Sequence, residues 1–245
     1  MLLSREKITP LVSELLGTFI LTFVVLSVSK SAIGIPYFVA IAAGFVLSMA
    51  VVVVGKYSGA HINPAVTFGL WSAKKIGTLK AILYIAVQFM GAAFAWRLYT
   101  YLIDSTIPNI ANTEFDWRIF TAEMVGALIF TFGLAAAIYQ KLESGKLALT
   151  AGVSLTVGII VASAASNGVI NPAVALGIQS WSKAYVIAPL VGGLIGVNLY
   201  ALLFAGANFE WVKPKSTKPV TKKVSASKKS TSKKPTNKTA KRKKK

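Results

Sequence analysis

The chain has 245 residues, of which 54% are hydrophobic and 14% are charged, and its mean hydropathy is +0.62. This composition excludes an ordinary soluble globular domain and favours an integral membrane protein. The net charge of +19 is uneven, because residues 1–210 hold 12 of the 27 basic side chains and all 8 acidic ones, whereas residues 211–245 hold the remaining 15 basic ones. The chain has no cysteine, so it forms no disulfide.

Six apolar stretches are long enough to cross a bilayer. A helix rises 1.5 Å per residue, so about 20 residues span a hydrocarbon core of roughly 30 Å. The predicted spans are residues 10–29, 36–55, 81–103, 118–140, 147–165 and 184–208. The first contains Glu14 and is not followed by a clear small-residue cleavage site, so we interpret it as a span of the mature protein and not as a signal peptide.

Basic residues between the spans predict the orientation. Six spans place both termini on one side, and cytoplasmic loops carry more lysine and arginine. Eight basic residues fall on the side of the termini and four on the other: Arg5, Lys7, Lys56, Lys74, Lys75, Lys80, Lys141 and Lys146, against Lys30, Arg97, Arg118 and Lys183. Both termini are therefore expected in the cytosol.

Two halves of the chain repeat the same landmarks. "SELLGTFILTF" at 13–23 and "AEMVGALIFTF" at 122–132 share the pattern E-x-x-G-x(4)-T-F. Asn63 follows Glu14 by 49 residues and Asn171 follows Glu123 by 48, and each asparagine opens an Asn-Pro-Ala tripeptide. Each half, about 8–103 and 117–208, holds three spans. Because three is odd, the second half must enter from the opposite side, which predicts an inverted repeat.

Each Asn-Pro-Ala is predicted to start a short helix. Proline suits the first helical position and asparagine the N-cap, so helices should begin at Pro64 and Pro172. The apolar stretch from Asn63 to Ala73 would be about 15 Å long as a helix, half a bilayer. We expect the two half-helices to enter from opposite faces and meet at the midplane. Such backbone is tolerated there only where it is buried or lines a watery cavity.

The repeated glutamates are expected to support these loops. A carboxylate inside a span is costly, but one that accepts hydrogen bonds from unpaired backbone N–H groups satisfies both partners. The alternative for Glu14 and Glu123 is that each reaches the lipid headgroups, which explains their shared spacing less well.

The expected meeting point favours uncharged solutes. Each half-helix directs about half an elementary positive charge toward the midplane, which repels cations. We expect each asparagine to cap its helix with the side-chain oxygen, which leaves both amide hydrogens free to donate to water or a small neutral solute. Orienting the water oxygen interrupts the chain along which protons would pass. The sequence therefore predicts a pore that excludes ions and protons.

Residues 10–210 resemble the major intrinsic protein (aquaporin) family, through "SGAHINPAVTFG" at 58–69, "INPAVALG" at 170–177, both glutamate motifs and the order of the spans. The chain is most similar to plant tonoplast-intrinsic members. The resemblance implies an all-α membrane protein with six transmembrane helices plus two re-entrant half-helices, one pore per subunit, a homotetramer and no cofactor or metal. It assigns to the pore the motif residues Asn63, Pro64, Ala65, Asn171, Pro172 and Ala173. It also assigns His61, for which a loop-bracing role is the alternative.

The resemblance also implies four constriction positions, which are Ala43, Ile159, Gly168 and Val174 in this chain. Most members have arginine where Val174 stands, and tonoplast-like members usually have histidine where Ala43 stands. Small or aliphatic residues here predict a permissive filter that passes glycerol, urea, ammonia or hydrogen peroxide as well as water. The alternative is that neighbouring side chains refill the space and keep the pore narrow.

Residues 211–245 are predicted to form a disordered, lysine-rich cytosolic tail. It could contact anionic lipid, an attraction that phosphorylation of Ser225, Ser227, Ser230 or Thr231 would weaken; a plain solvated extension is the alternative. Specific nucleic-acid binding is not expected, because no aromatic residue follows Trp211. The ending "KRKKK" resembles a retrieval signal of the endoplasmic reticulum, which makes that membrane one candidate. The resemblance to tonoplast-intrinsic members makes the vacuolar membrane the other.

Two other function classes stay open beside a passive channel for residues 1–210. A coupled secondary transporter also uses inverted repeats around broken helices, but normally needs a free ionisable residue at the midplane. A non-conducting structural protein would act through its basic tail. An enzyme is not expected, because no nucleophile pairs with a base in the sequence.

Overall fold

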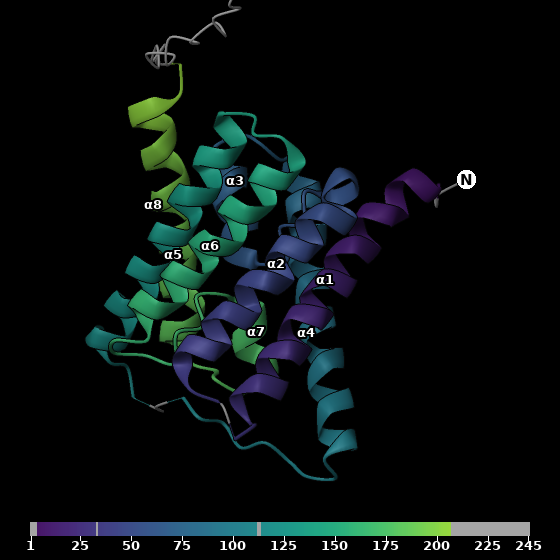
Figure 1. Cartoon of the computed structure of the whole chain (residues 1–245), viewed down its shortest axis with the longest axis vertical. Coiled ribbons are helices and arrows are strands. Elements are labelled where there is room, and N and C mark those ends of the chain that lie inside the picture. Colours follow the sequence, from purple (N-terminus) through teal and green to yellow (C-terminus); the bar gives the residue numbers. More distant parts are fainter. Residues whose placement is uncertain (1–3, 33, 112–113, 207–245) are drawn as a thin grey trace, which may run out of the picture. The chain divides into compact units, whose positions relative to one another are not determined.

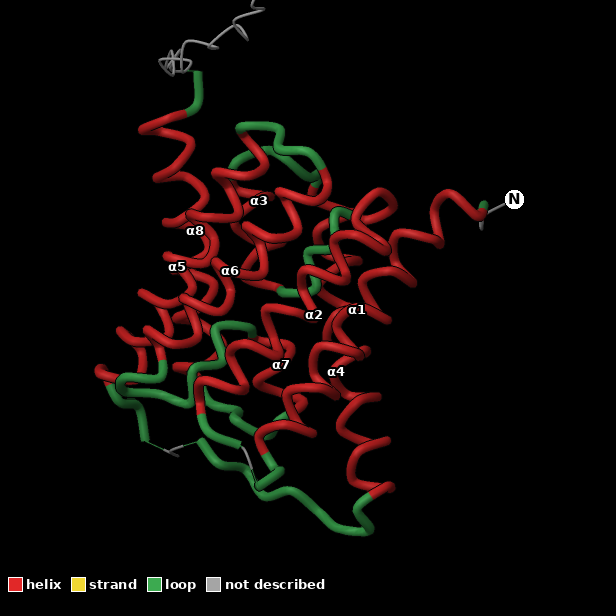
Figure 2. Tube along the Cα trace, in the orientation of Figure 1, coloured by secondary structure: helices red, strands yellow, loops and turns green. Residues whose placement is uncertain are grey.

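The computed structural model describes residues 4–32, 34–111 and 114–206, and these residues form helices and loops without a strand (Figures 1 and 2). The predicted tail at 211–245 lies outside the described residues. The described helices are α1 (Arg5–Ser29), α2 (Pro36–Ser58), α3 (Pro64–Ser72), α4 (Thr78–Leu102), α5 (Trp117–Tyr139), α6 (Ser144–Ala162), α7 (Pro172–Gly177) and α8 (Lys183–Phe204).

Six of these helices, all except α3 and α7, are long and apolar enough to cross a membrane. This confirms the predicted all-α class and the number of spans in the described part of the chain. Large apolar side chains remain exposed on the outer faces, among them Phe45 at 72% and Leu202 at 81%. Such exposure suits contact with lipid.

Several span boundaries differ from the prediction, since α2 ends at Ser58 and not at 55, α4 begins at Thr78 and not at 81, and α8 ends at Phe204 and not at 208. Helix α1 begins at Arg5 and not at residue 10, because the Ser4 carbonyl accepts the N–H groups of Lys7 and Ile8 and the polar first turn continues the apolar helix. Helix α6 occupies Ser144–Ala162 and not 147–165. Its apolar composition continues past Ala162, so hydropathy alone placed the end three residues late.

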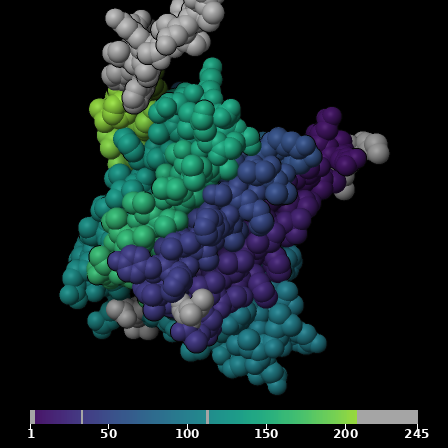
Figure 3. All heavy atoms as spheres, viewed as in Figure 1, coloured from purple at the N-terminus to yellow at the C-terminus, as the bar shows by residue number. Residues whose placement is uncertain are grey.

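Small residues let the long helices approach one another closely. Helices α2 and α6 lie side by side on the face seen in Figure 3. A Cβ added to Gly44 would lie 2.7 Å from the Gly152 carbonyl oxygen, and one added to Gly152 would lie 2.5 Å from that of Gly44. The two backbones are therefore in direct contact, as in other membrane helix pairs. Three glycines of α8, Gly192, Gly193 and Gly196, likewise face other chain segments and not open space.

Each half-helix packs on the last span of the other half of the chain. Helix α3 contacts α8, and α7 contacts α4. Gly69 and Gly177 lie at these two crossings. A Cβ on Gly69 would collide with the Gly193 carbonyl, and one on Gly177 would lie 3.0 Å from the Ala92 carbonyl oxygen. The two halves are thereby interlocked, and α3 and α7 contact each other.

Candidate pore

Both motif asparagines cap their half-helices, as predicted. Asn63 has extended backbone, and its Oδ1 accepts the N–H of Ala65 at 2.7 Å. Asn171 is also extended, and its Oδ1 accepts the N–H groups of Ala173 and Val174 at 3.1 and 3.3 Å. The prolines that follow occupy the first helical turn, where a missing N–H costs no hydrogen bond.

The two carboxamides are tied to each other's loops by a reciprocal pair of hydrogen bonds. Asn63 Nδ2 donates to the Ile170 carbonyl at 3.0 Å, and Asn171 Nδ2 donates to the Ile62 carbonyl at 3.0 Å. The expectation that both hydrogens of each amide are free to donate to a solute is therefore wrong, because one hydrogen of each amide bonds the opposite loop. The other hydrogen can donate to a solute.

An isoleucine in the left-handed region precedes each asparagine. The φ angle is +40° at Ile62 and +43° at Ile170, a conformation that costs a β-branched residue roughly 1–3 kcal/mol. The glycine of each E-x-x-G motif makes room for these side chains. A Cβ on Gly17 would lie 2.5 Å from Ile62 Cγ2, and one on Gly126 would lie 3.0 Å from Ile170 Cγ2. The turn directs each isoleucine carbonyl to the opposite asparagine.

Glu14 holds the first loop, as predicted. Its side chain is fully buried, and its two carboxylate oxygens accept the N–H groups of His61 at 2.9 Å and Ile62 at 2.6 Å. Gln88 adds a third hydrogen bond, donated from Nε2 at 2.8 Å. Charged acceptors make such bonds stronger than neutral ones, so this carboxylate offsets the strain of the turn.

Glu123 holds the second loop in the same way. It is fully buried and accepts the N–H groups of Val169 at 2.9 Å and Ile170 at 2.6 Å. Its third partner is the Ser166 hydroxyl, at 2.7 Å. Both glutamates therefore accept hydrogen bonds from the loop before a half-helix, which is the loop support expected of them.

Sequence reasoning missed Gln88 and Ser166, because neither belongs to the repeat. Gly91 and Gly192 pack against the glutamate-bearing helix of their own halves at matching positions. This alignment puts Pro189 where Gln88 stands in the first half. Since proline has no donor, the second half satisfies its glutamate with the serine of the adjacent loop. The only signal for Gln88 is a polar residue inside an apolar span.

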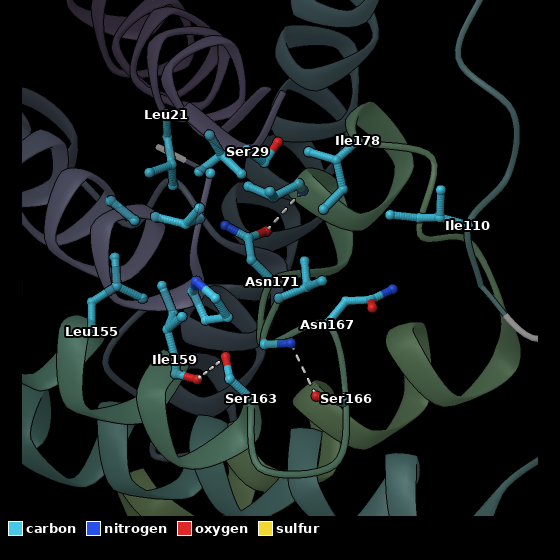
Figure 4. Close-up of a pocket in the computed structure, with 18 of the residues that line it drawn as sticks. Leu21, Ser29, Ile110, Leu155, Ile159, Ser163, Ser166, Asn167, Asn171 and Ile178 are labelled. Carbon is cyan, nitrogen blue, oxygen red and sulfur yellow. Dashed lines mark hydrogen bonds between the residues drawn. The ribbon is translucent and has the colours of Figure 1, made fainter. Parts of the chain in front are cut away.

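A cavity of about 260 Å³ lies on the side of α7, and we name it the outer cavity. Figure 4 shows Asn171 among the side chains that line it, together with Leu155 and Ile159. All four positions implied by the resemblance lie in its wall: Ala43, Ile159, Gly168 and Val174. The walls are mostly aliphatic, and among the described residues that line them one is charged, Lys30, and none is acidic.

The loop before α5 closes over one side of the outer cavity. Ile110 lines the cavity, and its N–H donates to the Gln179 carbonyl at 2.7 Å. Asn109 clamps the same region by donating to the Trp181 carbonyl and accepting the Trp181 N–H, both at 3.1 Å. This loop is therefore fastened to the segment that follows α7.

A second cavity, of about 500 Å³, lies on the side of α3, and we name it the inner cavity. His61 lines it, with its Nδ1 3.1 Å from Thr67 Oγ1 and its ring edge-on to Tyr84. Asn63 and the motif residues Pro64, Ala65, Pro172 and Ala173 are buried and line neither cavity. The reciprocal asparagine pair thus lies between two cavities, with Asn171 facing the outer one.

Alanine at Asn171 is expected to lower the free energy of unfolding by about 1–3 kcal/mol, since it removes an N-cap and leaves the Ile62 carbonyl unpaired. Unfolding in detergent titrated with sodium dodecyl sulfate measures this. Asn198→Ala is the matched control, because Asn198 contacts Ser72 Oγ away from the midplane. A leak of K⁺ in vesicles with Asn171→Ala and none with Asn198→Ala is also expected. Equal leaks would contradict the role of the pair in ion exclusion.

The comparisons with known proteins agree with this geometry. The sequence profile of the family described as Major intrinsic protein matches residues 1–204. The chain belongs to the major intrinsic protein family. Aquaporin Z of Photorhabdus laumondii is 30% identical in an alignment of 225 residues that covers 80% of this chain and 97% of that protein. A probable TIP-type aquaporin of Medicago truncatula is 33% identical in an alignment of 183 residues that covers 69% of this chain and 72% of that protein.

A solved structure shows the same fold. The X-ray structure of the aquaglyceroporin from Plasmodium falciparum has a TM-score of 0.63 at 22% identity and covers 81% of this chain and 96% of that one. Together with the six apolar helices, membership in the major intrinsic protein family makes the chain an integral, multi-pass membrane protein. The family resemblance stated from the two motifs is confirmed, and TIP-type proteins are among the relatives.

Proposed function

We propose that this member of the major intrinsic protein family is a passive channel for water and small neutral solutes. The observation that carries the proposal is the reciprocal pair of Asn63 and Asn171 at the tips of two half-helices, between the outer and inner cavities. The named relatives from Photorhabdus laumondii and Medicago truncatula are aquaporins, which supports the same function.

The geometry favours neutral molecules over ions. The N-termini of α3 and α7 both begin at the asparagine pair, so the positive ends of two helix dipoles act on the same point and oppose cations. The second hydrogen of each carboxamide donates to the oxygen of a passing molecule. A water whose oxygen accepts a hydrogen bond from both carboxamides has no lone pair left to accept a hydrogen bond from the next water in the pore, which interrupts proton transfer.

The outer cavity supports a permissive constriction. Ala43 and Gly168 contribute almost no side-chain volume, and Ile159 and Val174 add no hydrogen-bond donor. We propose that these four residues form the selectivity filter and admit glycerol, urea and ammonia beside water. Cation exclusion then depends mainly on the half-helix ends, because the fixed arginine charge of other members is missing.

The hydrogen bonding of the glutamates argues against a coupled transporter. Glu14 and Glu123 are the acidic residues in the apolar part of the described spans, and each already accepts three hydrogen bonds from its loop and neighbours. Protonation or ion binding at either would break the support of the pore. A passive channel needs neither protonation nor ion binding at these glutamates. No enzymatic activity is part of the proposal.

The finer organisation is also proposed. Residues 1–210 form the channel domain, with one pore per chain in a homotetramer, and both termini face the cytosol. Residues 211–245 form a lysine-rich cytosolic tail that can contact anionic lipid. Of the two candidate membranes, the TIP-type relatives favour the vacuolar one.

Stopped-flow light scattering on proteoliposomes tests the channel. Vesicles with the protein are expected to shrink faster than empty vesicles in an impermeant osmolyte, and to re-swell faster in glycerol or urea. Permeation without any ion gradient separates a channel from a coupled transporter. Equal rates with and without protein for all three solutes would favour a structural role for the basic tail.

A further inference from the structure

Three lysines line the inner cavity, and they come from separate segments. Lys56 lies near the end of α2, Lys75 in the loop between α3 and α4, and Lys80 in the first turn of α4. No aspartate or glutamate is among the described residues that line this cavity. Ion pairs in the described part of the chain join Arg118 to Asp116 and Lys146 to Glu143, so these three lysines have no carboxylate partner there.

The lysines are positioned by aromatic rings. The Nζ of Lys75 lies 4.0 Å from the centroid of the Tyr139 ring, which brings the loop lysine against the end of α5. Lys80 Nζ lies 5.1 Å from the Tyr84 ring, and Lys56 Nζ lies 4.7 Å from the Tyr57 ring. Cation–π contacts restrict the side chains without neutralising their charge.

The surroundings of the cavity stay positive after the neighbouring carboxylates are counted. Glu14 accepts the N–H of the lining residue His61. Glu143, which precedes the lining residue Ser144, pairs with Lys146. One unpaired carboxylate is thus outnumbered by three ammonium groups. Low-dielectric walls strengthen the field inside a cleft lined by one sign of charge. The volume of about 500 Å³ is within the range of roughly 300–1,000 Å³ typical of small-molecule sites.

We propose that the inner cavity binds a phosphate-bearing polyanion through Lys56, Lys75 and Lys80, and that the bound anion obstructs the pore. Binding needs only the lysines and the cavity, whereas obstruction rests on the proposed channel function. A soluble polyphosphate and a lipid headgroup carry the same chemistry, and inorganic triphosphate in neutral-lipid vesicles represents the soluble source.

Acetylation footprinting tests binding independently of transport. The full chain in neutral-lipid vesicles is treated with acetic anhydride with and without triphosphate, and modification is read residue by residue by mass spectrometry. We expect protection of Lys56, Lys75 and Lys80 but not of Lys146, which lies on α6 outside the cavity lining. Because acetylation is read at each lysine, protection of the cavity lysines is distinguished from binding of triphosphate to the lysine-rich tail. Equal modification of the three lysines with and without triphosphate would overturn the proposal.

Water permeability tests obstruction. Triphosphate on both sides of the membrane is expected to slow water flow, with permeability normalised to the triphosphate-free value of each variant. Lys75→Ala and Lys80→Ala should each raise the half-inhibitory concentration about fivefold, while Lys146→Ala, with the same tail, should not change it. High salt should weaken the inhibition through screening.

The outcomes distinguish obstruction of the pore from the channel function itself, and a soluble polyphosphate from a lipid headgroup. Inhibition by triphosphate in neutral vesicles assigns the soluble source, and inhibition by phosphatidic acid in the bilayer alone, relieved by the same variants, assigns the lipid. Inhibition by neither, or equal inhibition of all variants, overturns obstruction. Vesicles that conduct no water even without triphosphate would instead contradict the channel function and leave the footprint as the measure of binding.

Discussion

Arginine in place of Val174 is expected to lower glycerol and urea permeability at least about tenfold while water permeability falls less than about threefold. Val174 is 3% exposed and lies in the wall of the outer cavity, where Ala43 and Gly168 leave space for a longer side chain. The guanidinium would add bulk, five N–H donors and a fixed positive charge to the four constriction positions, whose side chains now carry neither a donor nor a charge. Stopped-flow measurements with the three solutes on the same vesicles give both ratios.

Val174→Met is the matched control for this substitution, because methionine adds length without charge or donors. We expect methionine to reduce glycerol flow less than arginine does and to leave the glycerol-to-water ratio nearer that of the original chain. If arginine reduced water and glycerol in the same proportion, Val174 would not determine selectivity, and the constriction would lie elsewhere in the pore.

Alanine in place of Glu123 is expected to lower the free energy of unfolding by about 3–5 kcal/mol. The substitution leaves the N–H groups of Val169 and Ile170 and the Ser166 hydroxyl without their buried acceptor. It also removes the support of Ile170 in its left-handed conformation, so the second asparagine loses its position. Fluorescence size-exclusion chromatography after heating measures the loss and needs no thiol, which this chain lacks.

The two halves allow an internal comparison for the glutamates. Glu14→Ala should cost a similar amount, since the same two backbone donors lose their acceptor in the first half. Glu143→Gln is the control, because Glu143 is exposed and pairs only with Lys146 on the surface, a contact of little energy. A Glu123→Ala protein as heat-resistant as Glu143→Gln would show that the loop keeps its turn without the carboxylate.

Much of the fold could be predicted because hydropathy and the internal repeat both indicate how the chain crosses the membrane. The six spans follow from apolar length alone, and the glutamate and asparagine spacing predicts the two re-entrant loops and their support. Each of these is a local or repeated pattern. The start of α1 at Arg5 and the end of α6 at Ala162 were missed because polar residues can continue a helix and apolar residues can follow one.

What the sequence could not provide are contacts between segments that share no pattern. The bonds from Asn63 and Asn171 to the opposite isoleucine carbonyls depend on the turn at each isoleucine, which hydrophobicity does not encode. Gln88 supports only one glutamate, so a search for repeats overlooks it. The lysines of the inner cavity contribute to the predicted orientation, but their convergence on one cavity is visible only in the structure.

The exchange of half-helices between the two halves has a consequence for biogenesis. The ribosome releases α3 long before it has synthesised α8, the helix against whose Gly193 backbone Gly69 is seated. Until α8 is made, α3 lacks the helix on which it packs. Because a re-entrant segment is not tolerated alone in hydrocarbon, we expect α3 to stay near the insertion machinery until then. Two fragments split between α4 and α5 would therefore each be incomplete, and a working pore would require them to find one another in the bilayer.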